Sequence, residues 1–222
     1  MKARARPRIK VCCIKSVEEA WLAIDAGVSA LGLVSEMPSG PGVISEERAA
    51  EIAAAVPPGV DAFLLTSLQD VDALVEQNAF VKARALQLVD ALPRGAHAEL
   101  RRRLPGVKLV QVIHVTGPES IDEAEAVAGE VDAILLDSGN PSLEVKELGG
   151  TGRRHDWEVS RRIREAVEVP VWLAGGLRPE NAAEAVEAVG PFGLDVCSGL
   201  RSGGDFSLDV GKLRAFTAAA RG

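Results

Sequence analysis

The feature of this sequence that most constrains its fold is a repeat. A short apolar run followed by an amphipathic helical segment recurs about every 25 residues along the chain. Such apolar runs are typical of strands buried on both faces, as in parallel sheets. The predicted strands are 9–14, 30–34, 61–66, 83–89, 108–115, 131–137, 169–174 and 194–197, and the predicted helices are 17–26, 45–56, 70–77, 96–103, 117–128, 157–166, 179–188 and 208–220.

Helix caps support this division of the chain. Ser16 with Glu19, and Thr116 with Glu119, have the spacing of a capping box, in which the serine or threonine and the glutamate bond each other's backbone N–H groups. Ser67 is available to cap the helix at 70–77. Each capping group therefore lies between a predicted strand and the helix that follows it.

Eight strand–helix units predict a single (β/α)8 TIM barrel over residues 1–222. A length of 222 residues suits one large α/β domain, and no break in composition divides the chain. The alternative is a doubly wound open sheet. That fold is disfavoured because the Gly-x-Gly-x-x-Gly pattern, with an acidic residue about twenty positions further on, is absent after the first strand.

Charge and composition point to a small-molecule partner. The net charge is −7 with no long basic block, which argues against nucleic acid or a membrane surface as the main partner. No apolar run reaches the ~18–20 residues of a membrane span, and no signal-type segment follows the basic N-terminus, so we expect a cytoplasmic protein. The three cysteines and three histidines lack the spacings of a disulfide framework or a metal site. The oligomeric state is left open as monomer or homodimer.

Two glycine-rich turns predict a phosphate site. Gly175 and Gly176 follow one apolar run, and Ser198 and Gly199 follow the last one. Backbone N–H groups in such turns can converge on one anion. In a TIM barrel, the loops after strands seven and eight commonly build a phosphate site. The sequence therefore predicts a small phosphorylated ligand.

Two side chains are candidates for the chemistry. Cys12 comes late in the first strand, and because side chains alternate along a strand, Cys12 and Cys13 are expected to face opposite ways. Asp137 ends an otherwise apolar strand, where a buried carboxylate needs a partner or a task. The structural alternatives are an ordinary core cysteine and a loop hydrogen bond. With the phosphate turns, the two residues place a thiolate base and an acid around a phosphorylated ligand.

Five motifs in order resemble one family. They are Lys10-Val-Cys-Cys-Ile14, Leu135-Leu-Asp-Ser138, Gly149-Gly-Thr-Gly152 before Asp156-Trp157, Ala174-Gly-Gly-Leu177, and Asp195-Val-Cys-Ser-Gly199. These segments resemble phosphoribosylanthranilate isomerase, a barrel of tryptophan biosynthesis. The resemblance implies an Amadori rearrangement without cofactor or metal, in which Asp137 is the general acid that opens the ribose ring and Cys12 is the base that removes the C2′ proton. It also implies that Asp195 contacts the substrate amine or ribose hydroxyls, and that Gly150, Gly152, Gly175, Gly176, Ser198 and Gly199 bind substrate or phosphate.

The sequence departs from this family on the side of substrate recognition. Gly42 stands where the family has an arginine for the anthranilate, Cys13 replaces a glycine and Cys197 replaces a serine. The Gln-Leu-His-Gly segment of the family becomes Gln87-Leu-Val-Asp90. Candidates for a replacement cation are Arg153, Arg178 and Arg201. Three hypotheses follow: the isomerase itself, a paralogue that isomerises another phosphorylated sugar or amine, and a phosphate-ligand binding protein without turnover.

Overall fold

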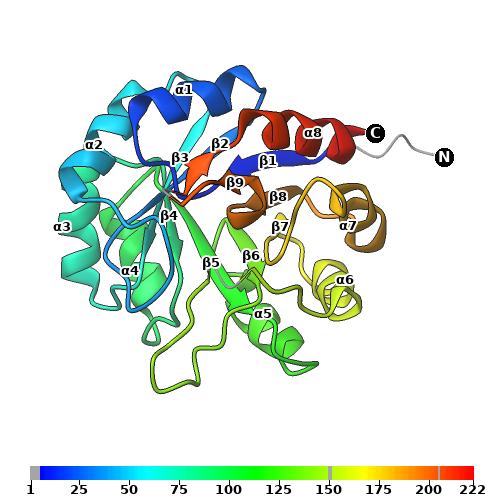
Figure 1. The fold of residues 1–222 in the computed structure, drawn as a ribbon. Coiled ribbons are helices and arrows are strands. Elements are labelled where there is room, and N and C mark those ends of the chain that lie inside the picture. The colour runs from blue at the N-terminus through cyan, green and yellow to red at the C-terminus, as the bar shows by residue number, and fades with distance from the viewer. Residues whose placement is uncertain (1–5, 150–151, 205) are drawn as a thin grey trace.

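Eight parallel strands close into a barrel, and each is followed by a helix on the outside (Figure 1). The computed structural model describes residues 6–149, 152–204 and 206–222. The strands are β1 (Arg8–Val11), β2 (Ala30–Val34), β3 (Asp61–Thr66), β4 (Ala85–Leu88), β5 (Lys108–His114), β6 (Ala133–Asp137), β7 (Val171–Leu173) and β8 (Gly193–Val196). The helices are α1 (Val17–Asp25), α2 (Glu46–Ala55), α3 (Val71–Val81), α4 (Ala96–Arg103), α5 (Ser120–Ala128), α6 (Trp157–Ala166), α7 (Ala182–Val189) and α8 (Val210–Arg221).

The barrel closes where the first strand pairs with the last. β1 and β8 run parallel, with Lys10 opposite Asp195 and Val11 opposite Val196. This closure confirms the predicted (β/α)8 barrel and excludes the doubly wound open sheet, in which the first and last strands do not meet. It also brings the carboxyl ends of all eight strands to one rim of the barrel.

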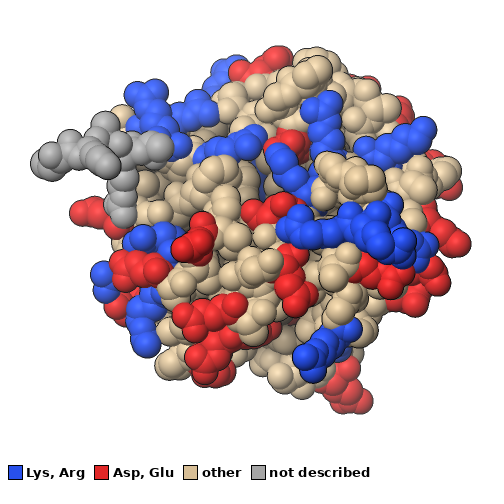
Figure 2. All heavy atoms as spheres, turned by 180° about the vertical axis from the view of Figure 1, so that it is seen from behind, with Lys and Arg blue, Asp and Glu red and all other residues tan. Residues whose placement is uncertain are grey.

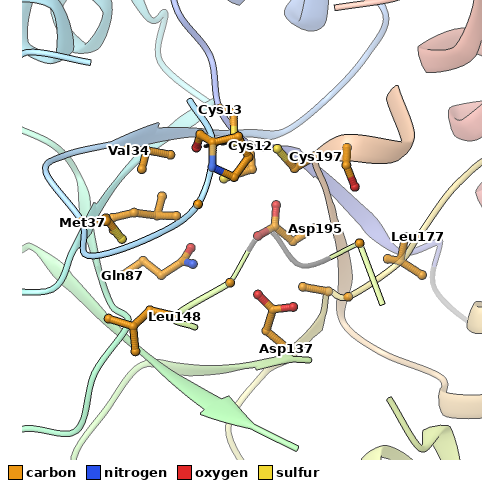
Figure 3. Close-up of a pocket in the computed structure, with 18 of the residues that line it drawn as sticks. Cys12, Cys13, Val34, Met37, Gln87, Asp137, Leu148, Leu177, Asp195 and Cys197 are labelled. Atoms are coloured by element: carbon orange, nitrogen blue, oxygen red, sulfur yellow. Dashed lines mark hydrogen bonds between the residues drawn. The ribbon is translucent and has the colours of Figure 1, made fainter. Parts of the chain in front are cut away.

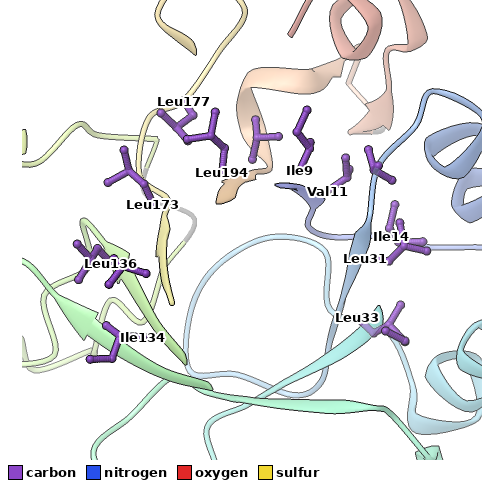
Figure 4. Packing of buried hydrophobic residues seen from close by; sticks show 14 of the residues in the cluster. Ile9, Val11, Ile14, Leu31, Leu33, Ile134, Leu136, Leu173, Leu177 and Leu194 are labelled. Atoms are coloured by element: carbon purple, nitrogen blue, oxygen red, sulfur yellow. The ribbon is translucent and has the colours of Figure 1, made fainter. Parts of the chain in front are cut away.

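Two apolar layers hold the barrel together. Outward-facing side chains such as Ile9, Val11, Leu31 and Leu33 pack against the helices, as Figure 4 shows for several strands. Inward-facing side chains fill the barrel interior, where Phe63 and Trp172 meet edge to face with ring centroids 5.8 Å apart. The alternation within each strand thus follows the pleat, one residue in and the next one out.

Several local predictions were wrong at the ends of elements. Asp70, rather than Ser67, caps α3 by accepting a hydrogen bond from the Ala73 N–H. The predicted box at Thr116 does not form, because the Thr116 hydroxyl bonds the Glu119 carboxylate and α5 begins without a side-chain cap. After β8 the chain makes a short 3-10 turn, η1 (Ser198–Leu200), and a hairpin of β9 (Arg201–Ser202) and β10 (Ser207–Leu208) that was not predicted.

The surface carries both charges. On the face shown in Figure 2, acidic and basic side chains are interspersed. Within the described part of the chain, no helix combines the length and the apolar character that crossing a bilayer requires.

Candidate active site

A pocket opens among the carboxyl ends of the strands (Figure 3). Its empty volume is about 670 Å³, which includes the open solvent at its mouth. The described residues that line it come from nearly every strand end and from the loops after β2 and β6: Cys12, Cys13, Val34, Met37, Ser39, Gly40, Pro41, Leu65, Gln87, Asp137, Leu148, Gly149, Gly152, Ala174, Gly175, Gly176, Leu177, Asp195, Cys197 and Ser198.

Cys12 and Cys13 both line this pocket, so the prediction that they face opposite ways was wrong. The regular strand ends at Val11, and Cys13 adopts a left-handed backbone conformation with φ of 62°. This turn of the backbone breaks the alternation that held through β1 and brings the second thiol to the same side. The Cys13 Sγ then lies 3.5 Å from the carbonyl oxygen of Pro41, which accepts a hydrogen bond from it.

Gly42 and Cys13 occupy one packing site. A Cβ atom at position 42 would lie 2.5 Å from the Cys13 Cβ, and Gly42 itself has a φ of +81°. No side chain therefore fits at Gly42 while Cys13 keeps its place. Two departures from the family motifs, the cysteine after Cys12 and the glycine in the second loop, are thus coupled by direct contact.

Neighbouring groups favour the thiolate form of Cys12. Interactions with the Cys13 and Cys197 side chains, followed by the charge of Lys10, outweigh burial and lower the pKa of the Cys12 thiol well below its usual value. The same interactions raise the pKa values of Cys13 and Cys197. One thiolate is therefore stabilised among three thiols, as a cysteine base requires.

Asp137 lies across the pocket from Cys12, at the end of β6 (Figure 3). Burial raises the pKa of its carboxyl group, and the backbone N–H of Ser138, which donates to Oδ1 at 2.7 Å, offsets only part of this shift. A carboxyl group whose pKa is raised keeps its proton closer to neutral pH, as a general acid requires. Gly149 leaves room for it, since a Cβ there would lie 2.8 Å from Asp137 Oδ2.

Asp195 and Lys10 form an ion pair inside the barrel. Lys10 Nζ donates to Asp195 Oδ2 at 2.7 Å, and the lysine side chain is fully buried. Burial, with the nearby Cys12 and Asp137, outweighs the attraction of Lys10 and raises the pKa of Asp195 to about 7. The other oxygen, Oδ1, is buried and has no partner within the described chain, and Asp195 lines the pocket.

The glycine-rich turns after β7 and β8 lie together. Gly175 and Gly176 have φ of 80° and 62°, which side chains disfavour, and both line the pocket with Ser198. A Cβ at Gly152 would lie 3.5 Å from the Ser198 hydroxyl, so the loop after β6 joins this end of the pocket. Gly199 packs against the turn after β7, where a Cβ atom at position 199 would overlap the carbonyl oxygen of Leu177. The remaining predicted site residue, Gly150, lies outside the described residues.

Arg201 has a place that the sequence did not reveal. It is only 5% exposed, and its guanidinium donates to the carbonyl oxygens of Cys12 and Cys13, each at 2.7 Å. It also pairs with Glu19, which accepts a further bond from the Lys15 N–H. Arg201 therefore holds the turn that carries Cys12 in place through its backbone carbonyl groups.

The end of the pocket opposite the glycine-rich turns is neutral. Neither arginine nor lysine is among the described residues that line the pocket. Arg153 pairs with Glu147, and Arg178 is exposed beside Glu180, so with Arg201 turned away, none of the three candidate cations lines the pocket. Apolar side chains form this end together with Gln87, which is 4% exposed and whose Oε1 has no partner within the described chain.

The fold and the pocket define a class of protein: a TIM-barrel enzyme whose active-site rim presents a thiol, two carboxyl groups and glycine-rich turns to a small ligand. A family model described as "N-(5'phosphoribosyl)anthranilate (PRA) isomerase" matches residues 9–219. A curated relative of that name from Natronomonas pharaonis is 39% identical over 216 residues, which cover 97% of this chain and 98% of the relative.

Solved structures agree with this match. The phosphoribosyl anthranilate isomerase of Thermotoga maritima has a TM-score of 0.82 and 26% identity, covering 96% of this chain and 98% of that one. A second isomerase structure, a complex with reduced 1-(o-carboxyphenylamino)-1-deoxyribulose 5-phosphate, has a TM-score of 0.80 and 24% identity, covering 96% and 98%. The chain belongs to the N-(5'-phosphoribosyl)anthranilate isomerase family. The predictions of this family and of an isomerase are therefore confirmed.

Proposed function

We propose that this protein catalyses the Amadori rearrangement of N-(5'-phosphoribosyl)anthranilate to the 1-deoxyribulose phosphate in tryptophan biosynthesis. Family membership over residues 9–219 and the named relatives support the activity. The observation that carries the assignment of residues is the placement of Cys12 and Asp137 on opposite sides of one pocket (Figure 3).

In this proposal Asp137 begins the reaction. Its carboxyl group gives a proton to the ribose ring oxygen as the bond from that oxygen to C1′ breaks, which leaves a protonated Schiff base. The Cys12 thiolate then removes the C2′ proton, and the electron pair forms a double bond between C1′ and C2′ while neutralising the iminium. The resulting enol-amine gains a proton at C1′ and loses one from the C2′ hydroxyl, which gives the ketone. The proton transfers assigned to Asp137 and Cys12 are ordinary general acid–base steps.

The remaining site residues bind the substrate in this proposal. Asp195 Oδ1 contacts the amine or a ribose hydroxyl, and its lack of a partner within the described chain supports this role. The turn at Gly175 and Gly176, with the turn at Ser198 and Gly199, holds the phosphate through backbone N–H groups. Gly152 lies close enough to Ser198 to border the same anion, and Gly150 remains a predicted contact.

Genetic complementation and a direct assay test the function. The chain is expected to restore growth without tryptophan to an auxotroph that lacks this isomerase. In the fluorescence assay of substrate loss, Cys12→Ser and Asp137→Asn are each expected to lower kcat by roughly 10²- to 10⁴-fold, as the loss of a general acid or base does. Asp122→Asn, on the exposed face of α5, is the matched control and should keep full activity. Retained turnover in either site variant would disprove the assigned role.

The neutral end of the pocket favours a second candidate, a paralogue that acts on another phosphorylated amine. The substrate analogue that lacks the anthranilate carboxylate separates the two functions. A site selective for the carboxylate should prefer the natural substrate by far more than tenfold in kcat/KM. Recognition through neutral hydrogen bonds, each worth about 0.5–1.5 kcal/mol, predicts a preference of roughly tenfold or less. Phosphate binding without turnover of any amine tested would instead indicate a binding protein.

We also infer a cytoplasmic location, which the biosynthetic role of the family supports. The partner is a small phosphorylated substrate in this proposal, and the choice between monomer and homodimer stays a prediction that sedimentation can test.

A further inference from the structure

All three cysteines of the chain lie at one end of the pocket, and all three are free thiols. Cys12 and Cys13 follow β1, and Cys197 follows β8, the strand paired with it. Figure 3 shows the three side chains gathered together on the side of the pocket away from Asp137. The proposed isomerisation uses only the Cys12 thiol, so the two other thiols beside it call for a separate explanation.

The strand register places Cys12 and Cys197 at disulfide distance. Val11 lies opposite Val196, and the Cys12 N–H donates to the Val196 carbonyl oxygen at 2.9 Å, so Cys12 and Cys197 are the next facing pair. Neighbouring strands lie about 4.8 Å apart. Disulfides span Cα separations of about 4.4–6.8 Å, and both side chains point into the same pocket. A bond between them therefore requires little movement of the backbone.

Cys13 is a poorer partner for Cys12. Consecutive Cα atoms are about 3.8 Å apart, which is shorter than the usual disulfide range. The Cys13 thiol also donates to the Pro41 carbonyl oxygen. Geometry thus selects Cys197, on the adjacent strand, over the residue next in sequence.

Cys12 is the thiol that a small oxidant should attack. It borders the pocket, and interactions with the other two cysteine side chains together with the charge of Lys10 lower its pKa. The thiolate is the nucleophilic form of cysteine, and low-pKa thiols beside a second cysteine are the ones that oxidise reversibly.

We propose that hydrogen peroxide converts Cys12 and Cys197 into a reversible disulfide that switches the enzyme off and protects Cys12 from irreversible oxidation. The Cys12 thiolate attacks one peroxide oxygen, the O–O bond breaks, and hydroxide leaves, so that Cys12 becomes a sulfenic acid. The Cys197 sulfur then attacks the Cys12 sulfur, the S–O bond breaks, and the oxygen leaves as water with the Cys197 proton. Peroxide is reduced and two thiols are oxidised. A dithiol reductant reverses the bond by exchange.

The loss of activity rests on the proposed role of Cys12 as the base, whereas the disulfide itself does not. A direct test of the bond therefore uses the whole wild-type protein and no activity assay. After brief treatment with hydrogen peroxide, remaining thiols are alkylated and the digest is analysed by mass spectrometry. We expect a peptide that links Cys12 to Cys197 and lacks two hydrogens, with Cys13 alkylated. A link from Cys12 to Cys13, or sulfinic acid at Cys12 with Cys197 still alkylated, would overturn the proposal.

Variants test the protective role. In Cys197→Ser the sulfenic acid has no resolving thiol on the adjacent strand, so we expect Cys12 to proceed to sulfinic acid and the activity that dithiothreitol recovers to fall by about tenfold or more. Cys13→Ser is the matched control, since it removes a thiol beside Cys12 by the same exchange, keeps a polar side chain at that position and leaves Cys197 in place. The fraction recovered in this control should equal that of the wild type. Equal recovery in Cys197→Ser and the wild type would refute the mechanism.

The isomerase activity and the disulfide between Cys12 and Cys197 can each be disproved without the other. If the wild-type chain shows no isomerase turnover, the peptide map still decides whether the disulfide forms. If turnover is present but no linked peptide appears, only the redox inference is lost.

Discussion

Asp195 lies between a buried cation and the open pocket, and its environment couples the protein's stability to pH. Its pKa is raised to about 7 in the folded state, chiefly by burial, whereas an unfolded aspartate titrates near 3.9. Between these values the folded chain binds more protons than the unfolded chain. The contribution of Asp195 to stability is therefore fully present below about pH 4 and is lost as the pH rises to about 7.

Removing the Lys10–Asp195 pair should weaken the dependence of stability on pH. In the double variant Lys10→Met with Asp195→Asn, the free energy of unfolding should fall less between pH 4 and pH 8 than in the wild type, by up to roughly 4 kcal/mol. Urea unfolding across this range measures the difference. The single variant Asp195→Asn, whose amide stays neutral like the protonated carboxyl group, should show a similarly flattened dependence. Equal pH slopes in the wild type and the double variant would contradict the assignment.

At the scale of elements, the site depends on close contact between segments that are distant in sequence. The turn after β8 touches the turn after β7 because Gly199 has no side chain, and the hairpin of β9 and β10 reaches α1 through Arg201 and Glu19. These contacts hold the two glycine-rich turns together and support the turn that carries Cys12.

Gly199→Ala tests the first contact. A methyl group there would overlap the Leu177 carbonyl oxygen, so the two phosphate turns must move apart. We expect KM to rise by about tenfold or more and competitive inhibition by inorganic phosphate to weaken in parallel, since a lost charge-assisted hydrogen bond is worth about 1.5–3 kcal/mol. Gly204→Ala is the control, because a Cβ at that position meets no atom within 4 Å. An unchanged phosphate affinity in Gly199→Ala would exclude this turn from the anion site.

Arg201→Met tests the second contact. The variant leaves Glu19 buried without its partner, which should cost about 3–5 kcal/mol in the free energy of unfolding. Adding Glu19→Gln should restore much of that stability. The restored protein should still show a lowered kcat with KM nearly unchanged, because the carbonyl groups of Cys12 and Cys13 have lost their donor. If kcat recovers together with stability, Arg201 has no positioning role.

The elements themselves were predictable, and the contacts between them were not. β2, β3, α4 and α6 begin and end where the sequence pattern placed them, because local periodicity and capping determine such elements. The pattern could not reveal the left-handed backbone at Cys13, since only a glycine there would have signalled it. Nor could it pair Arg201 with Glu19, which are 182 residues apart in the chain. The motifs placed Cys12, Asp137 and the phosphate turns around one pocket, because strand ends in a barrel share one rim.

At the scale of the whole molecule, α8 completes the outer layer and packs against both α7 and α1. Phe216 of this helix is fully buried in the apolar layer outside the barrel. Phe216→Ala should lower the free energy of unfolding by about 3–5 kcal/mol, the usual cost of removing a buried aromatic ring. Phe80→Ala, at a ring that is 51% exposed, should change it by no more than about 0.5 kcal/mol. Chemical denaturation measures the free energy of unfolding of both variants. If Phe216→Ala lost as little stability as Phe80→Ala, the packing of α8 would not stabilise the barrel.

The junction of the first and last strands bears on how the enzyme is made in a cell. Asp195 leaves the ribosome 185 residues after Lys10, and Cys197 and the glycine-rich turn beside it follow Asp195. In the proposed mechanism, the nascent polypeptide until then carries its base without the ion pair beside it and without the last glycine-rich turn. Products terminated before Asp195 would therefore be inert, and catalysis begins only when the first and last strands of the barrel have paired.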